Sequence, residues 1–406
     1  MIDVGVVKEI RYNGERRISE LTTCYCSRAG WRQRSGRAGR VQDGVCWRLF
    51  DAELNTVEFS VPEIARVSVD DLVLQTTLMR DEGTGVDVNA EVGRLIQPPG
   101  AQVVDTCCSQ LVEIGAMEAM EGGGANIYQL TPLGYHLSQL PMDCRVGKLL
   151  LTGCLLGCLE PALIVAACLS APKNVMGFVN NSNREALNEV VDAGYGGRNT
   201  ACFVRGDFYA NVAVVEAFLV VQRQPLRTNE RMAWCRKRGL DFNALKEVVG
   251  LTGTFRNALI DADFVTAERT GNENSSNPLL LQCCLVGGLY PNVAVLQRPK
   301  QPNKGGRLVT RTGEVTKPHM NSFQAVRVKE AAVTGKDAYV VFNGMFRSVN
   351  KNGEGQVFLD QVNFVSRFSL LLFGGALTQE GSCVGVGSFL KFKVGGGGEE
   401  GNVIVR

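Results

Sequence analysis

Three arginines lie within seven positions of one another in segment 33–40, Q-R-S-G-R-A-G-R, where only small residues separate them. The two glycines allow a tight turn, and Arg37 and Arg40 are three positions apart, so they share a face of a helical turn. We expect this turn to begin a helix, where the positive end of the helix dipole attracts anions. Two guanidinium groups in this arrangement suit a phosphate group.

The spacing alone leaves a second interpretation of segment 33–40 open. A single basic cluster is commonly a solvated turn whose charges pair with nearby carboxylates.

The 406 residues suffice for about two to four domains. The composition, 45% hydrophobic and 21% charged residues, argues against a disordered chain. A formal net charge of +2 does not support nucleic-acid binding over the whole surface, so any basic surface must be local.

The 14 cysteines predict buried thiols in a reducing compartment. Many lie inside apolar runs, none has the spacing of a zinc site, and the first residues do not read as a secretory leader. The most apolar stretch, 149–172, is interrupted by Glu160-Pro161, which favours a pair of buried helices over a membrane span. We therefore expect an intracellular protein of the cytoplasm or nucleus, with no metal site of its own.

The elements that must position these residues follow from local patterns. Strand-like runs flank Asn13-Gly14, a pair typical of a β-hairpin turn. On a helix expected over 102–115, the inward residues would be Val103, Val104, Cys107, Leu111 and Ile114. The other expected elements are a helix over 62–80, a strand over 127–130, mostly helix over 132–264, and short strands over 279–286, 307–310, 325–328, 338–342 and 368–373.

Segment 33–40 matches motif VI of the DEAH-box helicases, Q-R-x-G-R-A-G-R, at every fixed position. Residues 27–29 resemble the Ser-Lys-Ala often found just before that motif, and residues 2–8 look like the strand that follows motif V. The chain resembles the same family, in the right order, at 61–66, 130–134, 140–141, 147–150, 288–292 and 371–375.

The resemblance implies roles for the residues of segment 33–40. Arg37 and Arg40 would be arginine fingers on the γ-phosphate of ATP bound between two RecA-like domains. Gln33 would position the γ-phosphate or the attacking water, and Gly36 would belong to the same ATP-binding turn. The hairpin at Asn13-Gly14 would part nucleic-acid strands.

The resemblance also implies a ratchet and a barrel that close over single-stranded RNA, held mainly by its backbone. The barrel segment 300–329 contains seven basic residues and one acid, Glu314, although a solvated loop is the alternative. The family often has His-Pro where this chain has Pro318-His319. The residues assigned to RNA, two beside motif VI and four in the barrel, are Ser27, Arg28, Arg307, Lys317, His319 and Ser322.

The implied fold class is a multidomain α/β plus α plus β protein. The expected parts are a partial second RecA-like domain at 1–59, a winged helix at 60–137, a helical ratchet domain at 138–270, a small OB-type β-barrel at 271–394 and a flexible tail at 395–406.

Two parts of helicase chemistry are not found in the sequence: a phosphate-binding G-x-x-x-x-G-K-[ST] loop and an Asp-Glu-x-His box for magnesium. We therefore expect the C-terminal portion of an ATP-dependent RNA helicase, inactive as an ATPase alone, with ATP and Mg²⁺ bound only in the complete protein. Two alternatives remain open. One is a non-catalytic RNA-binding or scaffold protein that keeps these modules, and the other is a platform whose barrel binds a G-patch-type activator protein.

Overall fold

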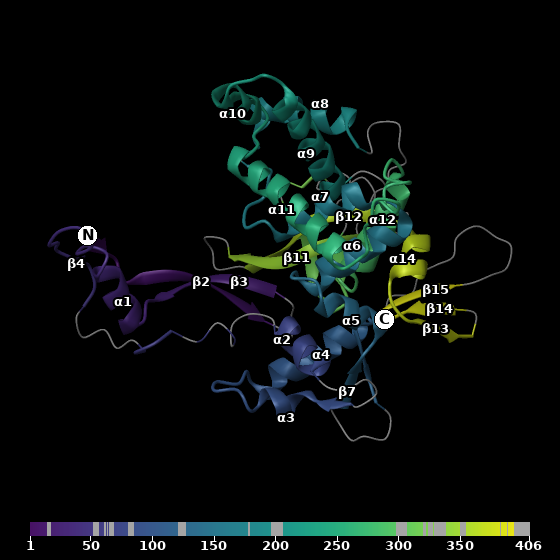
Figure 1. The fold of residues 1–406 in the computed structure, drawn as a ribbon, viewed down its shortest axis with the longest axis horizontal. Helices are drawn as coiled ribbons and strands as arrows, with labels where there is room; N and C mark the ends of the chain where they lie inside the picture. Colours follow the sequence, from purple (N-terminus) through teal and green to yellow (C-terminus); the bar gives the residue numbers. More distant parts are fainter. Residues whose placement is uncertain are drawn as a thin grey trace.

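The structure is a computed structural model with mixed helix and sheet and several separate sheets (Figure 1). It describes residues 1–13, 18–51, 57–60, 62, 64, 69–79, 85–120, 127–177, 179–195, 206–297, 307–319, 322–323, 328, 338–349, 355–381, 383–387 and 389–393.

The N-terminal lobe contains the arginine-rich segment. Strands β1 (Ile2–Asp3) and β4 (Trp47–Arg48) pair in parallel beside helix α1 (Arg28–Ser35). Trp31 anchors this helix, because its ring is buried and lies 4.6 Å from that of Phe50 between centroids. In Figure 1 this lobe stands apart from the rest of the molecule.

A long hairpin connects this lobe to the body of the protein. Strands β2 (Val6–Asn13) and β3 (Ile18–Tyr25) pair antiparallel along their whole length, which confirms the predicted hairpin, although its tip at 14–17 lies outside the described residues. The far end of β3 pairs in parallel with β11 (Tyr339–Val349) through Ile18 and Met345. The hairpin therefore ends against the sheet that contains Arg307 and Lys317, two of the predicted RNA-binding residues.

The next group combines four helices with a three-stranded antiparallel sheet of order β5-β7-β6. Its elements are α2 (Asp70–Leu78), β5 (Val86–Asp87), α3 (Val88–Val92), α4 (Ala101–Glu113), β6 (Met117–Ala119), β7 (Ile127–Leu130) and α5 (Pro132–Ser138). Of the helix expected over 62–80, the structure describes α2 from Asp70 to Leu78, while residues 63, 65–68 and 80 lie outside the described residues. Val103 was predicted to face inward on α4 but is exposed, and Cys108 is buried instead, because the apolar stripe runs through positions 104, 107, 108 and 111.

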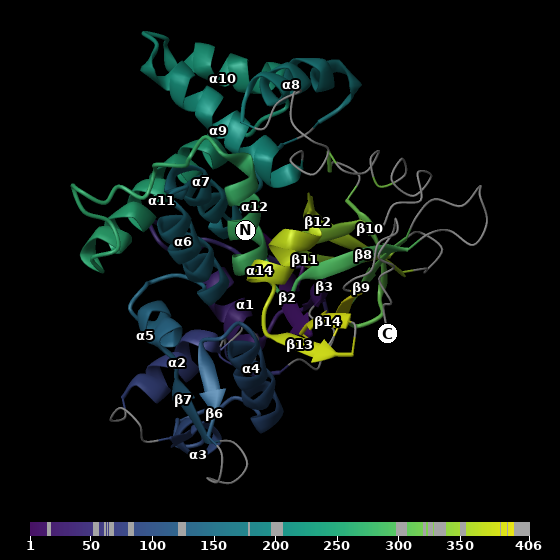
Figure 2. The same cartoon turned by 90° about the vertical axis from the view of Figure 1, so that its right-hand side faces the viewer.

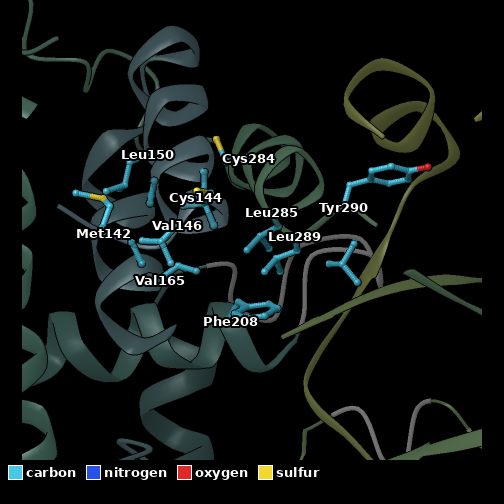
Figure 3. Close-up of a cluster of buried hydrophobic side chains, with 14 of the residues drawn as sticks. Met142, Cys144, Val146, Leu150, Val165, Phe208, Cys284, Leu285, Leu289 and Tyr290 are labelled. Carbon is cyan, nitrogen blue, oxygen red and sulfur yellow. The ribbon is translucent and has the colours of Figure 1, made fainter. Parts of the chain in front are cut away.

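Seven helices follow along the described chain: α6 (Cys144–Leu156), α7 (Leu159–Ser170), α8 (Asn181–Ala193), α9 (Asp207–Arg223), α10 (Thr228–Lys237), α11 (Phe242–Asp261) and α12 (Pro278–Leu289). Helices α6 and α7 confirm the predicted buried pair, and Gly157 ends α6 in the left-handed conformation. Helix α12 packs closely on α6 (Figure 3), since a Cβ at Gly288 would lie 2.9 Å from the Cα of Leu149. No helix in the described part of the chain has the length and apolarity needed to cross a membrane.

Two predicted strands are wrong. Segment 279–286 lies in α12, and segment 368–373 lies in α14 (Arg367–Phe373). A short run that is almost entirely apolar has neither a helical nor a strand period, so its pattern does not separate the two. The cap residues decide instead, because the side chains of Asn277 and Ser366 accept hydrogen bonds from the first turns of these helices.

The C-terminal part contains a closed cycle of five strands, paired in the order β8-β9-β10-β12-β11-β8 (Figure 2). Besides β11, these are β8 (Val293–Gln297), β9 (Arg307–Thr310), β10 (Val315–Pro318) and β12 (Gly355–Val365). A three-stranded sheet of β13 (Leu377–Glu380), β14 (Cys383–Val386) and β15 (Leu390–Lys393) follows. The strand expected at 325–328 lies outside the described residues except for Val328, and the expected tail at 395–406 lies wholly outside them.

Candidate functional site

Helix α1 is held firmly at its start. Ser27 is its N-cap, and the buried Ser27 Oγ accepts a hydrogen bond of 3.2 Å from the Gly30 N–H. The N–H groups of Arg28 and Ala29 donate to the carbonyls of Val57 and Glu58 at 3.0 and 2.9 Å. Ser27, predicted to contact RNA, therefore uses its hydroxyl to begin the helix.

Three of the five arginines on and after this helix have carboxylate partners. Arg34 lies 3.3 Å from the Asp3 carboxylate, whose side chain is 2% exposed, and it also donates to the Val6 carbonyl. Arg28 and Arg32 share the carboxylate of Glu58, the first at 4.0 Å. These contacts fix the orientation of the helix relative to β1 and the hairpin.

Arg37 and Arg40 differ from these three residues. Both are exposed, and neither has an ion pair or hydrogen bond from its side chain to any residue that the structure describes. Gln33 and Gly36 are exposed beside them, and the Gly36 N–H donates to the Arg32 carbonyl. The surface formed by Gln33, Gly36, Arg37 and Arg40 is called the arginine turn below.

The expectation that the arginine turn begins a helix is wrong. Helix α1 ends at Ser35, and residues 36–39 continue it only as a turn in which the Arg37 N–H donates to the Arg34 carbonyl. The N-cap is Ser27, and the glycines lie where helices stop. The helix dipole therefore does not attract an anion here, and any such attraction comes from the guanidinium groups.

The barrel residues predicted to contact RNA fall into two sets. Arg307 on β9 and Lys317 on β10 are exposed on neighbouring strands. The half-buried His319 ring lies 5.5 Å from Phe346 and 6.4 Å from Phe358 between centroids. Ser322 is buried, and its side chain hydrogen-bonds to Asp207 instead of facing solvent.

The sequence did not single out Asp207, which joins α9 to the barrel. Its carboxylate accepts hydrogen bonds of 2.8 Å from the N–H groups of Phe323 and Val362, besides the one from Ser322. Burial raises the pKa of Asp207 to about 6. An acid at the first position of a long, mostly apolar helix is the sequence signal that could have identified it.

The arginine turn has the chemistry for phosphate, but the metal that accompanies a nucleotide would need other groups. Among the described residues, no cluster of three or more His, Cys, Asp or Glu side chains is arranged to hold a metal ion. Guanidinium groups without protein partners can bind an anionic oxygen without first breaking an ion pair.

Comparisons with known proteins match both the helices and the chain as a whole. Residues 143–239 match the helicase associated domain (HA2), ratchet-like. The ATP-dependent DNA/RNA helicase DHX36 of Rattus norvegicus is 29% identical over 93% of this chain and 35% of its own length. The putative ATP-dependent RNA helicase DHX57 of Mus musculus is 30% identical over 74% of this chain and 22% of its own length. The putative DEAH-box ATP-dependent helicase UM11114 of Mycosarcoma maydis is 27% identical over 95% of this chain and 25% of its own length.

These matches define the class of protein as one that contains a ratchet-like helicase-associated domain. The chain belongs to the DEAH-box helicases and corresponds to their C-terminal portion. It spans about a third or less of the length of these relatives.

Proposed function

We propose that this chain supplies the arginine fingers of an ATP site and grips single-stranded RNA in an ATP-dependent RNA helicase. The observation that carries the ATP part is a division among the five arginines of residues 28–40. Three are paired with carboxylates and hold the helix, while Arg37 and Arg40 are exposed and have no partner among the described residues. Such guanidinium groups are available to stabilise charge on a transferring phosphoryl group.

In this proposal the lobe is part of a second RecA-like domain at 1–59. Exposed apolar side chains support this assignment, since Ile2, Trp47, Leu49 and Phe59 are 67–71% exposed and fit a face that the remainder of such a domain would cover. ATP and Mg²⁺ would bind in the complete protein, the magnesium on groups outside the described residues of this chain. Gln33 would orient the γ-phosphate or the attacking water.

The remaining boundaries are proposed as a winged helix at 60–137, a ratchet at 138–270, an OB-type barrel at 271–394 and a tail at 395–406. The helices with the β5-β7-β6 sheet fit a winged helix, and the closed five-strand cycle fits an OB-type barrel.

ATP would close the RecA-like domains and hydrolysis would reopen them, which would move RNA past the ratchet. A G-patch-type activator is a compatible partner that a pull-down would test, and we propose a site of action inside the cell, in the cytoplasm or nucleus.

The RNA part of the proposal predicts a change in salt dependence. Arg307→Ala and Lys317→Ala are each expected to weaken binding of all single-stranded RNA sequences alike, because both side chains are exposed cations that would contact phosphates. Each change should reduce the slope of log affinity against log salt by about 0.7. Fluorescence anisotropy with labelled RNA at several salt concentrations measures both effects.

The matched control is Arg94→Ala, which removes an exposed cation from α3's C-terminal end, where it pairs with Glu91 at 2.8 Å. Its affinity and salt slope should equal those of the wild type. Unchanged slopes in both barrel variants would contradict the assignment of phosphate contacts to this part of the barrel.

A further inference from the structure

A row of side chains crosses four strands of the barrel on one face. Strand pairing sets Phe346 on β11 directly opposite Phe358 on β12, and Phe358 beside Lys317 on β10. Strands β10 and β9 pair through Thr316 and Leu308, and the exposed Lys317 and Arg307 are the next residues on these two strands. Directly opposed residues share a face of the sheet, so two aromatic rings and two cations lie side by side.

This row lies outside the barrel core. The residues next to the two rings, Met345 and Leu359, are buried in the barrel interior, so the rings take the opposite face. Both rings are half-buried, with centroids 5.7 Å apart and planes inclined by 23°. His319 completes the group at 5.5 Å from Phe346. Phe346, Phe358 and His319 are called the aromatic platform below.

A kink in β11 and β12 brings the platform outward. Before the kink, Val340 and Phe342 are buried in the barrel interior, so the even-numbered residues of β11 point inward. After the kink Met345 is buried, so the odd-numbered residues point inward. The same change occurs on β12 at Gln361, whose φ is +46°. Asn211 of α9 donates a hydrogen bond of 3.3 Å to the Gln361 side chain and so supports the kink from the ratchet side.

The surface beside the platform is open at Gly344. A Cβ built on Gly344, two positions before Phe346, would meet no atom within 4 Å. Helices α9 and α12 contact these strands beyond the kink, through the Gly206–Asn363 bridge and the hydrogen bond from Gln282 to the Phe364 carbonyl. The near end of the platform adjoins the hairpin, where Ser19 of β3 pairs with Phe346.

We propose that the aromatic platform stacks an unpaired nucleobase, while Lys317 and Arg307 hold the adjoining phosphates. The assignment rests on the proposed RNA-binding function. That function involves contacts to the RNA backbone, and the platform adds a contact to the bases. Every base has a π-face, so the platform tolerates any sequence. The hairpin lies beside Phe346 at one end of the row, and the two cations lie beyond Phe358 at the other. Charge thus favours a nucleic acid over an uncharged peptide as the occupant.

The test compares two labelled RNAs of about 12 nucleotides, a length within the usual site sizes of such barrels. One is intact and the other carries abasic sites throughout, so both have the same number of phosphates. The full 406-residue chain is expected to bind the intact RNA about five- to 100-fold more tightly, the loss that base–aromatic stacking usually represents. Phe358→Ala should abolish most of that difference and leave the affinity for abasic RNA unchanged.

Two further variants keep the test decisive if Phe358→Ala folds poorly. Phe358→Trp should preserve the preference for intact RNA, and its added emission should be quenched by intact but not by abasic RNA. Phe368→Ala, which removes a phenylalanine that is 76% exposed on α14, should behave as the wild type.

The outcomes separate the platform from the function on which it rests. Equal binding of both RNAs by the wild type, with the loss on Lys317→Ala retained, would overturn the platform and leave the phosphate grip standing. Binding of neither RNA would overturn the RNA-binding function and the platform with it. An unquenched Phe358→Trp also overturns the platform, since a stacked base must lie against that ring.

Discussion

Replacing Arg40 with alanine is expected to lower RNA-stimulated ATP hydrolysis by about 10³- to 10⁵-fold, the usual contribution of an arginine finger. The measurement uses a chimera in which this chain replaces the matched region of the DHX36 relative, since the chain spans 35% of that protein. The reason is that the exposed guanidinium of Arg40 would stabilise charge that develops only in the transition state. The loss should therefore fall on kcat more than on KM.

Arg32→Ala is the matched control for this prediction. Arg32 is also exposed, with a side chain 67% exposed, and lies one position before the segment. Its partner Glu58 is shared with Arg28, so Arg32→Ala keeps one of the two contacts and should leave the rate nearly unchanged. An active chimera that is insensitive to Arg40→Ala would contradict the finger assignment. A chimera that binds RNA but shows no hydrolysis would instead support the non-catalytic scaffold.

The second large effect concerns pH and the contact between α9 and the barrel. Burial raises the pKa of Asp207 from 3.8 to about 6, so the folded chain keeps this proton at pH values where the unfolded chain has lost it. The contribution of Asp207 to stability is then greatest at low pH and falls as the pH rises from about 4 to above 6, by on the order of 3 kcal/mol. The asparagine in Asp207→Asn cannot titrate. The difference in the free energy of unfolding, wild type minus Asp207→Asn, should therefore fall by on the order of 3 kcal/mol as the pH rises from about 4 to above 6.

Denaturant unfolding of both proteins between pH 4 and 7.5 measures the difference. Asn211→Ala provides the control, because it removes another contact of the same junction, with Gln361, and adds no titrating group. Its curve should run parallel to that of the wild type at all pH values. If the free energy of unfolding of Asp207→Asn also runs parallel to that of the wild type at all pH values, the Asp207 carboxyl does not hold its proton in the folded chain.

The sequence singles out Arg37 and Arg40 as candidates but does not explain why they differ from their neighbours. Spacing and the motif VI resemblance identify all the arginines of the segment as one basic group. The partners that distinguish them, Asp3 and Glu58, lie 31 positions before Arg34 and 26 positions after Arg32. Such long-range pairs depend on tertiary packing, which a single sequence does not reveal.

The same limit explains the errors in the C-terminal part. Segment 279–286 is apolar at every position except Gln282, so its periodicity was uninformative and only the Asn277 cap favoured the helix. Phe346 and Phe358 look like ordinary strand residues in the sequence. A shift of one residue reverses the face on which a strand residue lies, and the kink at Gln361 makes such a shift.

The most direct measurement is a structure of the chimera with ADP and a fluoride mimic of the transferring phosphoryl group. We expect guanidinium nitrogens of Arg37 and Arg40 within about 3 Å of the fluoride atoms, as in charge-assisted hydrogen bonds. Both arginines turned away from the nucleotide, or paired with carboxylates as Arg34 is with Asp3, would contradict the assignment of this chain to an ATP site.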